Sequence, residues 1–103
     1  MYVLNYWHTV SDYGEWKKVF DSDPLGREAS GVRRLSIERP IDDEHQVIGE
    51  LEFDTLGEAE TFAARLQEVW KGLGGSVVSN AGSRITEVVV QQEFRGETAR
   101  KVA

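Results

Sequence analysis

The sequence predicts an α+β domain with the element order β-α-β-β-α-β. Two observations carry this prediction. Polarity alternates in short segments rich in β-branched and aromatic residues, and two longer segments place apolar residues at helical spacing behind a capping box. A chain of 103 residues builds one modest core. We therefore expect a single domain over residues 1–94 and a polar C-terminal tail over 95–103.

The first strand and the first helix follow each other almost without a loop. Residues 2–10 are dense in aromatic and β-branched residues, which favour a strand. Asp12 can cap the helix that follows, and Glu15 can complete a capping box. The apolar stripe of this helix consists of Tyr13, Trp16, Val19 and Phe20.

A break and then a hairpin are predicted next. Pro24 cannot continue a regular helix, so we expect a kink or a restart near 21–24 and an end at Gly31. Residues 32–39 and 46–54 then alternate in polarity on either side of a short polar turn. Two such strands with a short link form a hairpin.

A second helix and a fourth strand complete the pattern. Thr55 and Glu58 form the second capping box, and apolar residues, Trp70 among them, then recur with a 3.6-residue period as far as Leu73. We expect a small, polar, mobile segment up to Arg84 and the fourth strand over 85–94. This order is that of the ferredoxin-like fold, in which both helices cover one face of a four-stranded antiparallel sheet and leave the other face open.

Alternation assigns the strand residues to the two faces. We expect the helix face to hold Leu35, Ile37, Val47, Leu51, Phe53, Val88 and Val90. We expect the open face to hold Arg34, Ser36, Glu38, Ile48, Glu50, Glu52, Glu87, Val89 and Gln91. In the first strand Asn5 and Trp7 fall on the open face, and Leu4, Tyr6, His8 and Val10 fall on the helix face. A one-residue slip would exchange the two sets. A ring such as Trp7 on an open face favours a cover, and a second copy laid face to face is the simplest one.

Composition excludes several classes of function. The net charge of −6 repels a phosphate backbone, so we expect no nucleic-acid partner. The absence of cysteine excludes disulfides, a thiol nucleophile and a Cys-based zinc site, and it fits a reducing cytoplasm. No apolar run approaches the roughly 20 residues that span a bilayer. We expect a soluble, cytoplasmic protein with no membrane partner.

Neither acidic segment predicts a metal site. Residues 21–26 begin like a calcium loop, but Leu25 and Val32 stand where oxygen ligands are needed. Residues 42–45 lie within one short turn, where four adjacent side chains rarely converge on one ion. We therefore expect no metal.

Two sequence runs resemble the dimeric α+β barrel superfamily, which includes the antibiotic-biosynthesis monooxygenase-like proteins. They are H-x-V-x-D-Y-x-x-W-K-x-x-F, from His8 to Phe20, and L-E-F-D-T-L-x-E-A-x-x-F, from Leu51 to Phe62. The resemblance implies a homodimer whose two sheets close into a barrel, with a pocket in each protomer. It also implies a choice of activities, because some relatives oxidise polycyclic aromatic molecules without metal or flavin, others degrade haem or cyclise polyketides, and many have no known activity.

The first strand holds three candidate catalytic residues: Asn5, Trp7 and His8. In a cofactor-free oxygenase Trp7 would stack on the substrate, Asn5 would bond its oxygen and His8 would take a proton. Alternatively His8 is a hydrogen-bonded structural histidine, and Asn5 and Trp7 are dimer contacts. The candidate substrate-binding residues are Arg34, Glu50 and Ile48, although the two charged ones could pair across strands instead.

We therefore predict a homodimeric barrel protein that binds a small organic molecule and needs no cofactor. Monooxygenase-like or cyclase-like chemistry is compatible with this prediction. The alternative is a non-catalytic ligand-binding or interaction module.

Overall fold

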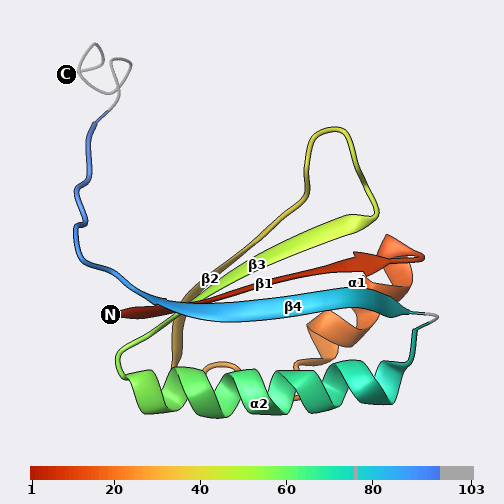
Figure 1. Cartoon of the computed structure of the whole chain (residues 1–103), viewed down its shortest axis with the longest axis horizontal. Helices are drawn as coiled ribbons and strands as arrows, with labels where there is room; N and C mark the ends of the chain where they lie inside the picture. Colours follow the sequence, from red (N-terminus) through yellow and green to blue (C-terminus); the bar gives the residue numbers. More distant parts are fainter. Residues whose placement is uncertain (76, 96–103) are drawn as a thin grey trace.

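A computed structural model describes residues 1–75 and 77–95, and it confirms the predicted element order. The elements are β1 (Tyr2–Val10), α1 (Tyr13–Ser22), β2 (Val32–Glu38), β3 (Gln46–Phe53), α2 (Leu56–Leu73) and β4 (Val78–Glu87). The four strands form one antiparallel sheet in the order β2-β3-β1-β4, and α2 lies along one face of it (Figure 1). The α+β, ferredoxin-like fold is thus confirmed.

The central strand β1 divides its side chains between the two faces as predicted. Its register sets Leu4 opposite Leu51 of β3 and opposite Ile85 of β4. Leu4, Tyr6, His8 and Val10 are buried against the helices, whereas Trp7 is exposed. The core on that side consists of Leu4, Tyr6, Val10, Trp16, Val32, Val47, Leu51, Phe53, Ala59, Phe62 and Val78.

Both helices begin at their predicted caps. The Asp12 carboxylate accepts a hydrogen bond from the Glu15 backbone N–H at 3.1 Å. The Thr55 hydroxyl accepts from the Glu58 N–H at 3.2 Å and donates to the Glu58 carboxylate at 3.1 Å. These bonds satisfy backbone donors that have no partner within the helix. The caps therefore fix where α1 and α2 start.

The end of α1 corrects the predicted kink or restart near 21–24. The helix stops at Ser22, and turns lead from there to β2. Asp23 adopts a left-handed conformation, with φ 52° and ψ 57°, and its carboxylate accepts from the Arg27 N–H at 2.9 Å. The chain therefore leaves the helix at Asp23, and Pro24 follows outside it.

The fourth strand lies earlier in the chain than predicted. The prediction placed it over 85–94, whereas β4 pairs with β1 from Val78, opposite Val10, to Glu87, opposite Tyr2. Because β1 begins at Tyr2, the residues after Glu87 have almost no strand left to pair with. The predicted positions in the sheet were therefore wrong for Val88, Val89, Val90 and Gln91, and Glu87 lies on the side of Tyr2 rather than on the open face.

The remaining predictions about the ends and the surroundings of the chain are tested only in part. Across residues 1–75 and 77–95, no helix is long and apolar enough to cross a membrane. The polar tail expected over 95–103 lies, apart from Arg95, outside the described residues, so the division at 94 stays a prediction.

Candidate functional site

An aromatic cage encloses His8 on the helix face of β1. The His8 side chain has no exposed surface. Its ring centroid lies 5.6 Å from that of Tyr6, 5.7 Å from Trp16 and 5.8 Å from Trp70. These rings come from β1, α1 and α2, so the cage forms only when both helices have packed on the sheet.

Local features of the sheet and of α1 set the cage in place. An added Cβ at Gly49 of β3 would overlap the Tyr6 ring, so glycine at this position lets the ring lie flat against the sheet. Trp16 stands in the first part of α1, which the Asp12 cap directs across the end of β1. Trp16 also packs on Phe20, with centroids 5.2 Å apart, so α1 presents two rings to the sheet.

Among residues 1–75 and 77–95, neither ring nitrogen of the His8 imidazole has a hydrogen-bond partner. Burial lowers the pKa of His8 to about 4, and the neighbouring Thr9 backbone opposes part of this shift. The ring is therefore neutral at pH 7, with one donor and one acceptor. A buried polar group without a partner costs about 1–3 kcal/mol.

A cavity of about 60 Å³ lies between the helices and the sheet, directly beside His8. Its walls are mainly apolar and include Tyr6, His8, Trp16, Phe62, Leu66 and Trp70. Since one water needs roughly 10–15 Å³ of cavity volume, the cavity holds a few waters. It is smaller than the cavity of about 150 Å³ that admits benzene in an engineered protein. A ring would therefore need side chains such as Trp70, which is only half-buried, to move.

Arg27 and Asp23 are charged residues in the cavity wall. The Arg27 guanidinium carbon lies 4.0 Å from the centre of the Phe20 ring, and Nη1 donates to the Phe20 carbonyl at 3.0 Å. Asp23 lies 3.5 Å from Arg27 Nε and balances its charge. Burial raises the pKa of Tyr6 to about 12, although the charge of Arg27 opposes this shift. Tyr6 therefore offers a neutral hydroxyl.

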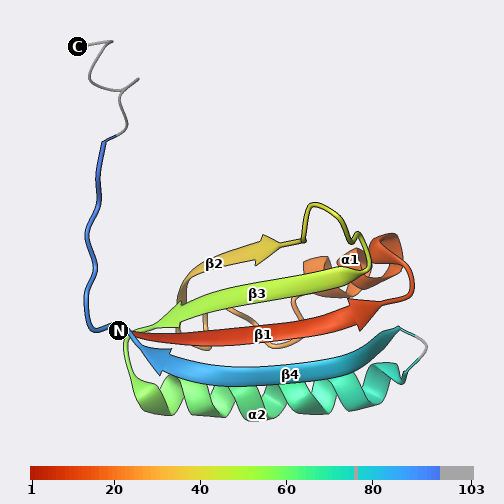
Figure 2. The same cartoon turned by 45° about the horizontal axis from the view of Figure 1, so that its top comes forward.

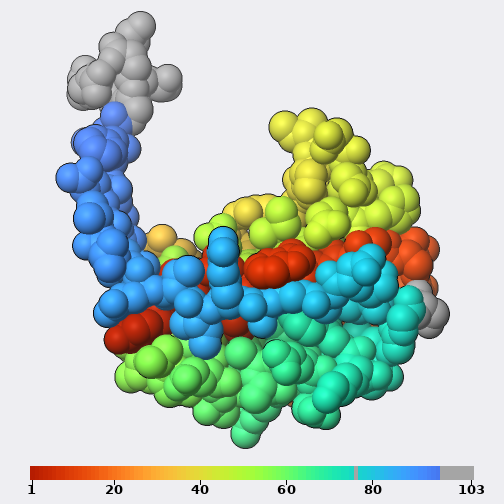
Figure 3. Space-filling model, viewed as in Figure 1, coloured from red at the N-terminus to blue at the C-terminus, as the bar shows by residue number. Residues whose placement is uncertain are grey.

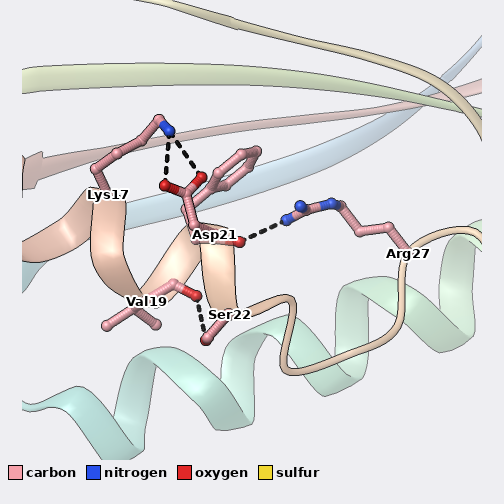
Figure 4. Close-up of polar contacts among 6 residues, drawn as sticks. Lys17, Val19, Asp21, Ser22 and Arg27 are labelled. Carbon is pink, nitrogen blue, oxygen red and sulfur yellow. Dashed lines mark hydrogen bonds and ion pairs between the residues drawn. The ribbon is translucent and has the colours of Figure 1, made fainter.

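Polar contacts fix the last turn of α1 beside this wall (Figure 4). Lys17 Nζ lies 2.7 and 2.9 Å from the two carboxylate oxygens of Asp21. The Ser22 hydroxyl donates to the Val19 carbonyl at 2.6 Å. Together with the Arg27 bond to Phe20, these contacts hold the C-terminal end of α1 over the cavity.

The other predicted catalytic residues lie on the opposite face of the sheet from His8. Asn5 Nδ2 donates to Thr86 Oγ1 at 3.1 Å and to the Val3 carbonyl at 3.3 Å. Trp7 is 37% exposed, and its ring lies over Gly82 of β4, where an added Cβ would come within 2.6 Å of it. One protomer therefore does not bring Asn5 and Trp7 together with His8.

The predicted substrate-binding residues also lie on the open face. Ile48 is the cross-strand neighbour of Trp7, and Glu50 is that of Asn5. A hydrogen bond that protonated Glu50 donates to the Glu38 carboxylate, followed by partial burial and nearby acidic charge, raises the pKa of Glu50. Arg34 reaches Glu52 at 3.8 Å. This face is polar and acidic around one exposed indole.

The cage around His8 is the part of the site that the sequence did not reveal. Alternation placed Tyr6 and His8 on the helix face, and helical spacing placed Trp16 and Trp70 in buried stripes. These rings meet at one end of β1 because of the way the helices cross the sheet. The spacing of residues in the sequence does not predict that crossing. Within the described part of the chain, no group of three or more His, Cys, Asp or Glu residues could hold a metal ion.

Comparison with known proteins supports the fold alone. A proposed antibiotic biosynthesis monooxygenase from Deinococcus radiodurans superposes with a TM-score of 0.75 at 12% identity, over 93% of this chain and 100% of that one. A mutant of MhuD with two manganese protoporphyrin IX molecules bound per active site gives 0.64 at 20% identity, over 91% and 100%. A dimeric ferredoxin-like protein from an uncultured marine organism gives 0.60 at 14%, also over 91% and 100%.

No family model matches the sequence, and no curated protein matches it significantly. These solved structures share the fold of this chain over nearly its whole length, so the comparison confirms the predicted α+β, ferredoxin-like fold.

Proposed function

We propose that the chain is a homodimeric protein that binds a small, flat organic molecule carrying one hydroxyl or carbonyl group in the cavity beside His8. One observation carries the proposal: a fully buried imidazole with two unpartnered nitrogens borders an apolar cavity. Ligand sites commonly combine apolar walls with a few convergent polar groups. The three surrounding rings favour an aromatic ligand, because aromatic rings stack or meet edge to face.

The energetics favour a ligand with a single polar group. A hydroxyl or carbonyl bonded to His8 would remove a cost of about 1–3 kcal/mol that the protein bears when the imidazole has no partner. A charged ligand gains less, because Asp23 already balances Arg27, the cationic residue in the wall. The ligand is therefore neutral and mostly apolar.

The residues present do not fit a porphyrin. A cavity of about 60 Å³ is well below the roughly 300 Å³ at which pockets for drug-sized molecules begin. A haem iron would also need His8 to reach it, whereas Tyr6, Trp16 and Trp70 enclose that ring. We therefore assign no haem chemistry to this chain.

Monooxygenase-like chemistry on the bound molecule is the second candidate. His8 is neutral at pH 7 and can accept a proton, and solved structures of this fold include proposed antibiotic biosynthesis monooxygenases. However, a general base works best with a pKa near the working pH, and a pKa of about 4 makes His8 a weak base. Binding is therefore the primary proposal.

The homodimer is proposed through the open sheet face. Trp7 and Ile48 are cross-strand neighbours there, and neither α1 nor α2 covers that side of the sheet (Figure 2). Solved structures with this fold include proteins described as dimeric and ferredoxin-like. A second copy laid over this face would cover the indole.

A comparison of phenol with toluene tests the binding proposal, because the two differ mainly in the hydroxyl group. A ligand that binds only the folded state raises its melting temperature. We expect phenol to stabilise the wild-type protein more than toluene does, and His8→Phe to abolish that difference. Equal shifts with both compounds, or an unchanged preference in His8→Phe, would contradict the role of His8. Oxygen uptake with a dihydroxylated probe tests the second candidate in the same samples.

A further inference from the structure

A β-bulge in β4 lies opposite His8. The register of β1 and β4 shifts between Trp7 and Thr9. Two residues of β4, Asn80 and Ala81, therefore lie opposite the single residue His8. Asn80 adopts a left-handed conformation there, with φ 53°. A bulge disrupts the pairing and bends the strand, and bulges are over-represented beside functional sites. The sheet is thus irregular at the position of the proposed ligand contact.

A groove of about 330 Å³ opens outside this bulge, between β4 and α2. The two elements lie side by side on the face that Figure 3 shows. The strand contributes Val78 and the small residues 79–83 to the groove, and the helix contributes Gln67, Trp70 and Lys71. Ser83 lies opposite Tyr6, so its hydroxyl is on the helix face of the sheet. The groove therefore has more polar side chains than the cavity beside His8.

Trp70 separates the groove from that cavity. Of the described residues, only Trp70 lines both spaces. Its half-buried ring meets the His8 ring edge to face, with 5.8 Å between the centroids and 72° between the ring planes. Trp70 lies near the end of α2, which stops at Leu73, and helix ends fray. A movement of this ring away from His8 would join the two spaces.

The opposite side of the cavity is held by polar contacts. The turn over residues 23–27 forms that side, and a second hollow of about 510 Å³ borders the same turn. Arg27 Nη1 donates to the Phe20 carbonyl at 3.0 Å. The Leu25 carbonyl accepts from the Ser30 hydroxyl at 2.7 Å. These bonds fix the turn, so the side closed by Trp70 is the one that opens more readily.

We propose that Trp70 is a gate, and that the groove between β4 and α2 is a second subsite for the polar chain of an elongated ligand whose ring lies beside His8. This rests on the proposed function, because it extends the same site. When the Trp70 ring leaves His8, the ligand ring takes its place, and the chain at the far end of that ring lies along residues 79–83. The chain is uncharged, because Lys71 in the groove lies 3.4 Å from Glu68, which balances its charge.

Two phenols that differ only at the end of a two-carbon chain test the subsite: 4-ethylphenol and 2-(4-hydroxyphenyl)ethanol. NMR titration gives the dissociation constant of each. We expect the wild-type protein to bind the alcohol about threefold to tenfold more tightly, although it is the less apolar compound, because one hydrogen bond between neutral groups contributes a factor of this size.

A double variant removes the polar side chains that would hold the chain. Ser83→Ala deletes the hydroxyl, and Asn80→Gly deletes the amide while glycine accepts the left-handed conformation. The preference for the alcohol should be lost in this variant. It should remain in Arg65→Ala, which alters the hollow on the other side of the cavity. Circular dichroism checks that each variant is folded.

The indole N–H signals of the three tryptophans test the gate. The variants Trp70→Phe and Trp7→Phe identify two of these signals by their loss. Binding of 2-(4-hydroxyphenyl)ethanol to the wild-type protein should move the Trp70 signal more than the Trp7 signal, because Trp7 lies on the opposite face of the sheet. A Trp70 signal that moves no more than that of Trp7 would overturn the gate.

The outcomes separate the subsite from the site beside His8. Equal affinity for the two compounds in the wild type, or a preference that survives in the double variant, would overturn the subsite. Phenol binding that depends on His8 would then still stand. If phenol does not bind at all, the proposed function and the subsite are overturned together.

Discussion

The imidazole of His8 stacks nearly parallel on the phenol ring of Tyr6, with ring centroids 5.6 Å apart and ring planes at 13°. The two residues are two positions apart on one strand, so alternation alone places them on the same face. The stacking supplies apolar contact to His8 without a hydrogen bond, and both ring nitrogens stay unpartnered. A polar ring without hydrogen bonds in an apolar cage lowers the stability of the folded protein, and it leaves a donor and an acceptor available to a ligand.

Replacing His8 with phenylalanine should stabilise the folded protein. The change removes an unpartnered polar group and keeps a flat ring, and the cavity beside it accommodates the larger side chain. We expect the free energy of unfolding at pH 7 to rise by about 1 kcal/mol, measured by urea denaturation. A loss of 1 kcal/mol or more would mean that His8 makes polar contacts that stabilise the fold.

The stability of the wild-type protein should depend on His8 between pH 6.5 and 4. The unfolded chain protonates His8 near its ordinary pKa of 6.5, whereas the folded protein resists protonation down to about 4. The unfolded state therefore binds more protons in this window, so stability is full above pH 6.5 and is lost as the pH falls towards 4. The difference corresponds to about 3 kcal/mol.

Denaturation across this pH range, in the wild type and in His8→Phe, measures the effect. The variant should lose this part of the pH dependence, while His45→Gln, at an exposed position in the β2–β3 link, should keep it. Parallel profiles for the wild type and His8→Phe would show that His8 titrates alike in both states.

Gly49→Ala should destabilise the protein through Tyr6. An added Cβ would overlap the buried Tyr6 ring, and overpacking in a core costs typically 1–3 kcal/mol. Gly57→Ala is the matched control, because an added Cβ there meets nothing within 4 Å and alanine favours a helix. We expect a loss of about 2–3 kcal/mol for the first variant and none for the second, measured by urea denaturation. Equal effects would show that the Tyr6 ring moves aside freely.

Glu50→Gln should raise the melting temperature more at pH 7 than at pH 4. The folded protein holds the pKa of Glu50 above its ordinary value, mainly through the hydrogen bond with Glu38. Stability from a raised carboxyl pKa is present below the unfolded value and is lost as the pH rises through the folded one. The neutral amide avoids that loss. Thermal melts at the two pH values check this, and a gain of equal size at both would contradict it.

Much of the fold could be predicted because its signals are local. The Asp12 and Thr55 caps fixed both helix starts, and alternation in β1 placed Asn5 and Trp7 on one face and His8 on the other. The position of the fourth strand was predicted wrongly, because the residues with the strongest β propensity are not the ones that lie opposite β1. Residues 79–83 are small and polar, yet they pair with β1, and Gly82 makes room for the Trp7 ring. The valines that favour a strand lie beyond the reach of β1.

The candidate site was predictable only in its separate parts. The sequence marked His8 as a candidate acid or base, but only the packed structure shows that its ring nitrogens find no hydrogen-bond partner among the described residues. Trp16 and Trp70 are 54 positions apart in the chain and each looks like ordinary helix core. Only the packed helices bring both rings within 6 Å of the His8 ring, at 5.7 and 5.8 Å between centroids.

A crystal structure of the wild-type protein soaked with phenol tests the central claim most directly. We expect density for the ring between α1, α2 and the sheet, with the phenol oxygen about 2.7–3.0 Å from a ring nitrogen of His8. Phenol bound instead on the open face beside Asn5 and Trp7, with the cavity beside His8 filled only by water, would contradict it.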